Sequence, residues 1–186
     1  MALAKDYDSV MERSEEIMKK SLGLDYNEFE SGLIAFDYEA LMKAAAYSLE
    51  EIQEMQTEVG VGNTPMLELR NITKLARKYS KPGYGARIFT KDEAANPSGS
   101  FKDRRASIAV AHAKKLGYEG VIAATSGNYG AAVASQAAMR GIKSIIVQEC
   151  YDSRRVGQPE IVEKARKCEA MGAEVIQLTV GPELFY

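Results

Sequence analysis

The sequence predicts an α/β protein built on a parallel sheet and preceded by an acidic helical arm. From residue 59 onward, short apolar or β-branched runs alternate with helical patterns. Their repeat of roughly thirty residues is typical of strand–helix–strand units in parallel sheets. Residues 1–58 instead show helical patterns rich in acidic side chains. We therefore expect a helical extension over 1–58 and an α/β part over 59–186.

The extension contains two helical patterns with an irregular stretch between them. Apolar residues recur at helical spacing over residues 6–22. Ser48 followed by Glu51 has the spacing of a capping box, which predicts a second helix over 48–58. Residues 26–47 alternate aromatic and acidic side chains without a clean period. This composition predicts an arm and not an independent domain.

In the α/β part, each predicted element is bounded by glycine or polar residues. The predicted strands are 66–69, 87–91, 120–124, 143–148 and 174–178. The predicted helices are 72–79, 102–116, 128–140 and 159–171. Four or five strands make a small sheet for this architecture, and the sequence stops directly after the last one. We therefore expect the chain to be the first part of a larger fold.

Composition excludes several classes of protein. Of the 186 residues, 46% are hydrophobic, and no window offers the ~20 uninterrupted apolar residues of a membrane span. The first 25 residues lack the apolar core of a signal peptide. The two cysteines are too few for a disulfide framework or a four-cysteine zinc site. We expect a soluble cytoplasmic protein.

Charge is distributed unevenly along the chain. Residues 1–60 hold 5 Lys/Arg and 14 Asp/Glu, whereas residues 61–186 hold 19 and 12. A basic body suits anionic small molecules such as phosphates, or a contact with an acidic segment or subunit. Two solvated surfaces of opposite sign explain the same numbers equally well. The basic residues are dispersed and lack interleaved aromatics, which argues against nucleic-acid binding.

The stretch Asn96-Pro-Ser-Gly-Ser-Phe-Lys-Asp-Arg-Arg105 is the first candidate for chemistry. Pro97 and Gly99 predict a tight turn, and Ser100 can cap the helix that follows. Lys102 then falls at or near the first helical turn, where the positive end of the helix dipole disfavours a cation. An amine that loses its proton readily can bond to an aldehyde cofactor. A solvated lysine on an ordinary capped helix is the alternative.

The second candidate is the loop Thr125-Ser-Gly-Asn-Tyr-Gly130, between a predicted strand and a predicted helix. Glycines and hydroxyls at such a turn leave backbone N–H groups open, and these bind carboxylate or phosphate. In a parallel sheet the loop lies at the carboxyl end of the strands, where ligands bind. It has neither a dinucleotide fingerprint nor a P-loop spacing. A tightly packed, capped helix is an equally good explanation of this loop alone.

In this order, the motifs Gly-Asn-Thr-Pro from Gly62, KDEAANPSGSFKDR from Lys91 and TSGNYG from Thr125 resemble one family. They resemble the fold-type II pyridoxal-phosphate enzymes, which include threonine synthase, cysteine synthase and tryptophan synthase β. The resemblance runs from about Val59 to the end of the chain. It implies the fold-type II architecture and pyridoxal 5′-phosphate as the cofactor.

The resemblance also implies roles for individual residues. Lys102 matches the catalytic lysine that holds the cofactor covalently and later moves protons. Asn128 matches the residue that hydrogen-bonds the 3′-oxygen of the cofactor. The residues that match the family's substrate-carboxylate loop are Thr125, Ser126, Gly127, Asn128 and Tyr129.

Further sequence motifs, such as FESGLIAFDYEALM in the arm and QECYDSR after residue 147, resemble one branch of the family. That branch cleaves 2-amino-4-oxopentanoate with coenzyme A to acetyl-CoA and alanine in ornithine degradation. It implies a β subunit that pairs with a small α subunit and with a second β subunit. The alternatives are a threonine synthase-like β-replacement or β-elimination enzyme, and an inactive fragment that acts only as a binding half. The family's glycine-rich phosphate loop is absent from these 186 residues.

The remaining candidates are weaker. His112 is the only histidine and has no metal-ligand spacing around it, so no metal site is predicted. Cys150 and Cys168 are expected to be packed, inert thiols. Asp92 and Glu93 could act in acid–base chemistry only if the fold brings them close to a substrate. The candidates for contacts with coenzyme A phosphates, with solvated surface as the alternative, are Arg104, Arg105, Arg154 and Arg155.

Overall fold

The computed structural model describes residues 13, 16, 19, 23–31, 37–125, 127–150, 156–157 and 159–178. The predicted helix over 6–22 falls almost entirely outside these residues. The chain divides into two compact units, Met1–Glu54 with Phe185–Tyr186, and Met55–Leu184. The predicted division into a helical extension over 1–58 and an α/β part over 59–186 stays a prediction.

The first unit contains short helices. The 3₁₀ helix η1 spans Tyr26–Phe29 and α3 spans Tyr38–Ala44; neither was predicted, because aromatic and acidic residues alternate there without a helical period. The helix α4 spans Leu49–Glu58 and runs across the boundary between the units. The Glu51 N–H donates to Ser48 Oγ (3.1 Å) and the Ser48 N–H donates to Glu51 Oε2 (2.7 Å). The predicted capping box is therefore confirmed.

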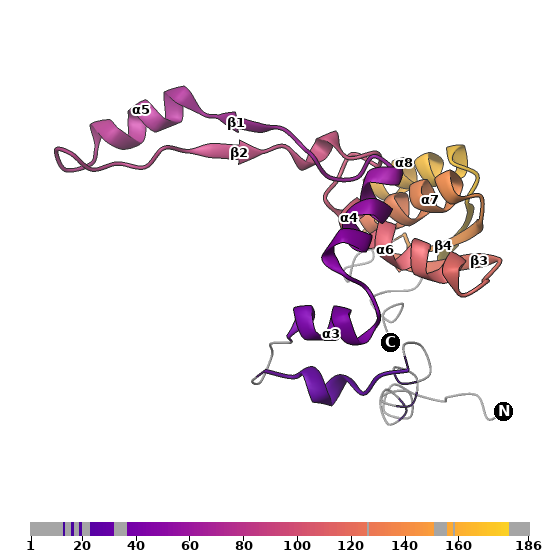
Figure 1. Cartoon of the computed structure of the whole chain (residues 1–186). Coiled ribbons are helices and arrows are strands. Elements are labelled where there is room, and N and C mark those ends of the chain that lie inside the picture. Colours follow the sequence, from indigo (N-terminus) through magenta and orange to yellow (C-terminus); the bar gives the residue numbers. More distant parts are fainter. Residues whose placement is uncertain are drawn as a thin grey trace. The chain divides into compact units, whose positions relative to one another are not determined.

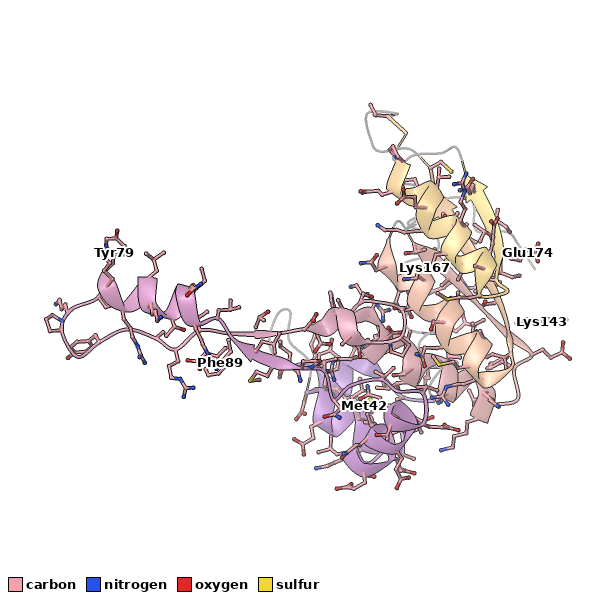
Figure 2. All side chains as sticks on the ribbon, turned by 90° about the horizontal axis from the view of Figure 1, so that it is seen from above. Met42, Tyr79, Phe89, Lys143, Lys167 and Glu174 are labelled. Carbon is pink, nitrogen blue, oxygen red and sulfur yellow. The ribbon has the colours of Figure 1, made fainter. Side chains whose placement is uncertain are left out.

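The second unit begins with a two-stranded antiparallel ladder. Strand β1 (Met66–Glu68) pairs with β2 (Phe89–Lys91), and the helix α5 (Arg70–Lys78) lies between them in sequence. The expectation that these two strands join the parallel sheet is wrong. The chain turns back after α5 through a turn in which the Tyr84 N–H donates to the Lys81 carbonyl, so it returns antiparallel to β1. Figure 2 shows Tyr79 and Phe89 on the segment that contains β1, α5 and β2, away from Lys143 and Glu174 of the main sheet.

The predicted parallel sheet is confirmed for the last three strands. Strands β3 (Gly120–Thr125), β4 (Lys143–Glu149) and β5 (Glu174–Leu178) lie in the order β3-β4-β5, and both pairings are parallel. The helices around this sheet are α6 (Lys102–Lys115), α7 (Asn128–Arg140) and α8 (Pro159–Ala170). The helix α7 packs against α6 and α8 and against β3 and β4 (Figure 1). In the described part of the chain, no helix has the length and apolar character that a bilayer span requires.

The core lies between α7 and the sheet and is built from small side chains. Its fully buried members are Ala106, Ala132, Ala134, Ala137, Ile146 and Cys168. Gly130 allows the closest approach, because a Cβ built on it would lie 2.5 Å from Thr125 Cγ2 and 2.8 Å from Ile146 Cγ2. The first turn of α7 therefore lies directly against the carboxyl end of β3 and the middle of β4, which positions the loop before it.

Candidate functional site

Lys102 is the first residue of α6, as predicted. Its backbone N–H donates to Ser100 Oγ (3.3 Å), although Phe101 occupies the N-cap position that was expected for Ser100. The half-buried side chain carries Nζ 4.6 Å from the centre of the Phe101 ring. Among the described residues, no hydrogen bond or ion pair occupies this ammonium group. The amine is therefore available to a ligand.

The turn before Lys102 is fixed by a carboxylate that sequence reasoning did not single out. Asp103 is fully buried, and its Oδ2 accepts the Ser98 N–H at 2.7 Å. Its Oδ1 accepts a hydrogen bond from Gln136 Nε2 at 3.2 Å. On the other side of the turn, Lys167 Nζ donates to the Ser98 carbonyl. The sequence showed only that an acidic residue suits the first turn of a helix.

The Gly-Asn-Thr-Pro motif is joined to the lysine motif by hydrogen bonds. The Gly62 N–H donates to Asn96 Oδ1 (3.0 Å), and Thr64 Oγ1 donates to Glu93 Oε1 (2.8 Å). Arg104 clamps the same carboxylate, with Nε–Oε2 2.7 Å and Nη2–Oε1 2.9 Å. These hydrogen bonds lower the pKa of Glu93 to about 2, with the guanidinium of Arg104 as the first cause. Glu93 and Arg104 thus hold two loops together, and Arg104 is not an open cation for a phosphate.

Hydrogen bonds within the Thr125–Gly130 loop fix its shape. Thr125 is buried, and its Oγ1 accepts the N–H groups of Gly127 (3.0 Å) and Gly130 (3.3 Å). Gly127 is the N-cap of α7 and Asn128 is its first residue, with an exposed side chain. The half-buried Tyr129 ring lies 4.6 Å from the Arg105 guanidinium carbon. Ser126 lies outside the described residues.

The two predicted motifs stand at the starts of two helices that pack against each other, and Arg105 of the first helix contacts Tyr129 of the second. Lys102 begins α6 and Asn128 begins α7. The two motifs offer a half-buried amine, an exposed amide and those N–H groups of the α7 N-terminus that Thr125 does not already hold. An amine bonds to an aldehyde, an amide donates to a phenolic oxygen and helix N–H groups bind an anion, so this set fits an aldehyde cofactor together with a carboxylate substrate. The roles of Lys102, Asn128 and the substrate loop stay predictions.

The remaining candidate residues are the two cysteines, the histidine and two arginines. Cys168 is fully buried, and burial raises the pKa of its thiol, as expected for an inert cysteine. Cys150 differs from the expectation of a packed thiol, because it is partly exposed after β4, where its N–H donates to the Leu178 carbonyl (3.0 Å). His112 is partly buried on α6, and no cluster suited to a metal ion occurs in the described part of the chain. Arg154 and Arg155 lie outside the described residues.

Comparisons with known proteins agree with these motifs. The family model of the pyridoxal-phosphate dependent enzymes matches residues 57–184. The chain is 72% identical over 186 residues to a 2-amino-4-ketopentanoate thiolase beta subunit of Acetoanaerobium sticklandii, covering 99% of the chain and 40% of that protein. It is 38% identical over 144 residues to a threonine synthase of Bacillus sp. (strain ULM1), covering 76% of the chain and 36% of that enzyme. The chain thus spans about 40% of the length of the thiolase subunit.

Solved structures show the same fold. A maize serine racemase superposes with a TM-score of 0.55 at 27% identity, covering 74% of this chain and 38% of the racemase. A hydrogen sulfide-producing enzyme of Fusobacterium nucleatum gives a TM-score of 0.50 at 30% identity, covering 67% of this chain and 36% of that enzyme. Because the family model covers most of the chain and includes both the lysine motif and the asparagine loop, this chain belongs to the family of pyridoxal-phosphate dependent enzymes, and pyridoxal phosphate is the cofactor it is built to bind.

Proposed function

We propose that this chain forms the cofactor-lysine part of a thiolase β subunit. The reaction is the cleavage of 2-amino-4-oxopentanoate with coenzyme A to acetyl-CoA and alanine, in ornithine degradation. One observation carries this proposal, the 72% identity over 186 residues to a 2-amino-4-ketopentanoate thiolase beta subunit. The identity extends through the acidic arm, which lies before the 57–184 span matched by the family model.

The proposed reaction balances without an oxidant or reductant. The coenzyme A sulfur forms a bond to C4 of the substrate, and the C3–C4 bond breaks as acetyl-CoA leaves. The electron pair left on C3 takes up a proton, and alanine results. When bound, the cofactor supplies an electron sink conjugated with these carbons.

The residues of the chain have separate parts in this proposal. Lys102 holds the cofactor through Nζ and then moves a proton to or from the substrate carbons. Asn128 orients the cofactor ring through its exposed amide. The loop Ser126–Tyr129 binds the substrate carboxylate at the start of α7, with those of its N–H groups that Thr125 does not already hold. Thr125 contributes indirectly, because its buried hydroxyl already accepts two N–H groups of that loop.

The thiolase proposal includes partners. The relative is named a beta subunit, and this name implies a partner subunit. We propose that this chain pairs with a small α subunit and with a second copy of the β subunit. Coenzyme A is an intracellular cosubstrate, so we place the reaction in the cytoplasm. A threonine synthase-like β-replacement or β-elimination is the second candidate, supported by the 38% identity to a threonine synthase.

The test uses the full-length protein together with its partner subunit. Acetyl-CoA formation from 2-amino-4-oxopentanoate and coenzyme A is measured for the wild type, for Lys102→Ala and for the exposed control Lys143→Ala. We expect Lys102→Ala to lower turnover by a factor of about 10²–10⁴, with the control unchanged. Full turnover by Lys102→Ala contradicts the proposed role of the lysine. A wild type that turns over phosphorylated hydroxyamino acids without coenzyme A favours the second candidate instead.

A further inference from the structure

The backbone of Ser98, four residues before Lys102, is held at both its N–H and its carbonyl. Its N–H donates to Asp103 Oδ2 (2.7 Å), and its carbonyl accepts a hydrogen bond from Lys167 Nζ of α8, which Figure 2 labels. Ser98 and Ser100 are both buried, with their hydroxyl oxygens 3.4 Å apart. The turn that leads into α6 therefore has little freedom, and the position at which Lys102 leaves the helix is set by these contacts.

The second oxygen of the same carboxylate reaches the helix of the asparagine loop. Asp103 Oδ1 accepts a hydrogen bond from Gln136 Nε2 (3.2 Å), and both side chains are fully buried. Gln136 lies on α7, about two helical turns beyond Asn128. One buried carboxylate thus touches the turn before Lys102 with one oxygen and the helix that begins at Asn128 with the other.

The contact has a defined polarity. Asp103 Oδ1 accepts from Nε2, so Gln136 presents its NH₂ group to Asp103. Gln136 Oε1 is then left buried without a partner among the described residues. A buried polar atom without a partner is costly. The contact with Asp103 therefore fixes which end of the Gln136 amide faces the carboxylate.

We infer that Asp103 and Gln136 form a positioning pair that sets the placement of Lys102 relative to Asn128. This inference rests on the proposed role of Lys102 as the cofactor lysine. The pair does not touch the cofactor. It acts through the Ser98 turn on one side and through α7 on the other, so its loss changes how well both helices present their first residues to one ligand.

The experiment measures cofactor binding and not turnover alone. The full-length protein is freed of cofactor and titrated with pyridoxal phosphate, and the affinity and the pH midpoint of the visible absorption band are recorded. Borohydride reduction followed by peptide mapping shows whether the cofactor is attached to Lys102. Circular dichroism melting curves establish that each variant folds.

Asp103→Ala removes both acceptors, and Gln136→Leu removes one donor without adding a conflict. We expect both variants to bind the cofactor about tenfold more weakly, the value of one buried hydrogen bond. We also expect them to shift the pH midpoint of the band. Asp92→Ala, the same exchange at an N-cap in the η2 turn (Glu93–Ala95), is the control and leaves both quantities unchanged.

The double variant Asp103→Asn/Gln136→Glu tests the pairing itself. The new amide accepts the Ser98 N–H through its oxygen and donates to the new carboxylate at position 136, so each donor again meets an acceptor. Recovery of affinity and pH midpoint supports the inference, whereas a double variant no better than the single ones overturns it. Folded single variants with wild-type values overturn it as well. A wild type that carries no cofactor on Lys102 overturns the proposed function together with the inference.

Discussion

The guanidinium of Arg104 grips the carboxylate of Glu93 with two hydrogen bonds of 2.7 and 2.9 Å. The two residues are eleven apart in sequence, and their ion pair joins the turn after the antiparallel β1–β2 ladder to the first turn of α6. Thr64 Oγ1 donates to the same carboxylate, and Asn96 Nδ2 donates to its Oε2 at 3.0 Å. Three segments of the chain thus meet at one carboxylate, since Asn96 lies only three residues beyond Glu93.

This arrangement predicts an acid-sensitive contribution to stability. The pKa of Glu93 falls from its ordinary value of 4.5 to about 2 in the folded protein. Because the folded-state pKa is lowered, the stabilisation is fully present above pH 4.5 and is lost as the pH falls toward about 2. We expect Glu93→Gln to flatten the decline of the thermal midpoint within this window. Glu174→Gln, at an exposed glutamate at the start of β5, is the control and keeps the wild-type decline.

A second prediction concerns the close approach of α7 to the sheet. A Cβ at Gly130 would lie 2.5 Å from Thr125 Cγ2 and 2.8 Å from Ile146 Cγ2, so Gly130→Ala forces core side chains to move. We expect a loss of about 1–3 kcal/mol in the free energy of unfolding, measured by denaturant titration. Ala138→Ser, at an exposed position of the same helix, is expected to change it by less than about 0.5 kcal/mol. Equal stability of Gly130→Ala and the wild type would contradict the packing described here.

The parts of the fold that sequence predicted well are those with local signals. The strand Glu174–Leu178 and the helix Asn128–Arg140 have the predicted bounds, because apolar runs and glycine punctuation mark their ends. The pairing of β1 with β2 was missed because strand direction depends on where the chain turns, and a helix between two strands is typical of a parallel pair. The links through Asp103 and Glu93 were missed for a similar reason. Their partners lie 33 and 29 residues away in sequence, and no local pattern marks such contacts.

A third prediction tests Asn128, whose exposed amide stands at the first position of α7. If this amide donates to the cofactor's phenolic oxygen, its removal costs one hydrogen bond to a charged group. We expect Asn128→Ala to weaken cofactor binding about 10- to 100-fold and to displace the visible band. The measurement is a spectroscopic titration of the full-length protein. Unchanged binding and an unchanged band would show that the role implied by the family motif does not hold at this position.

The two thiols should differ sharply in reactivity. Cys168 is fully buried on α8 and its pKa is raised by burial, so at neutral pH it is a thiol without access to reagents. Cys150 is partly exposed at the end of β4. We expect a maleimide to label Cys150 in the native protein and both cysteines in denaturant, as read by mass spectrometry. Under native conditions, the Cys150→Ser variant should then remain unlabelled. Labelling of Cys168 at a comparable rate would mean that α8 opens readily from the core, and Lys167 of α8 could not then hold the Ser98 carbonyl for most of the time.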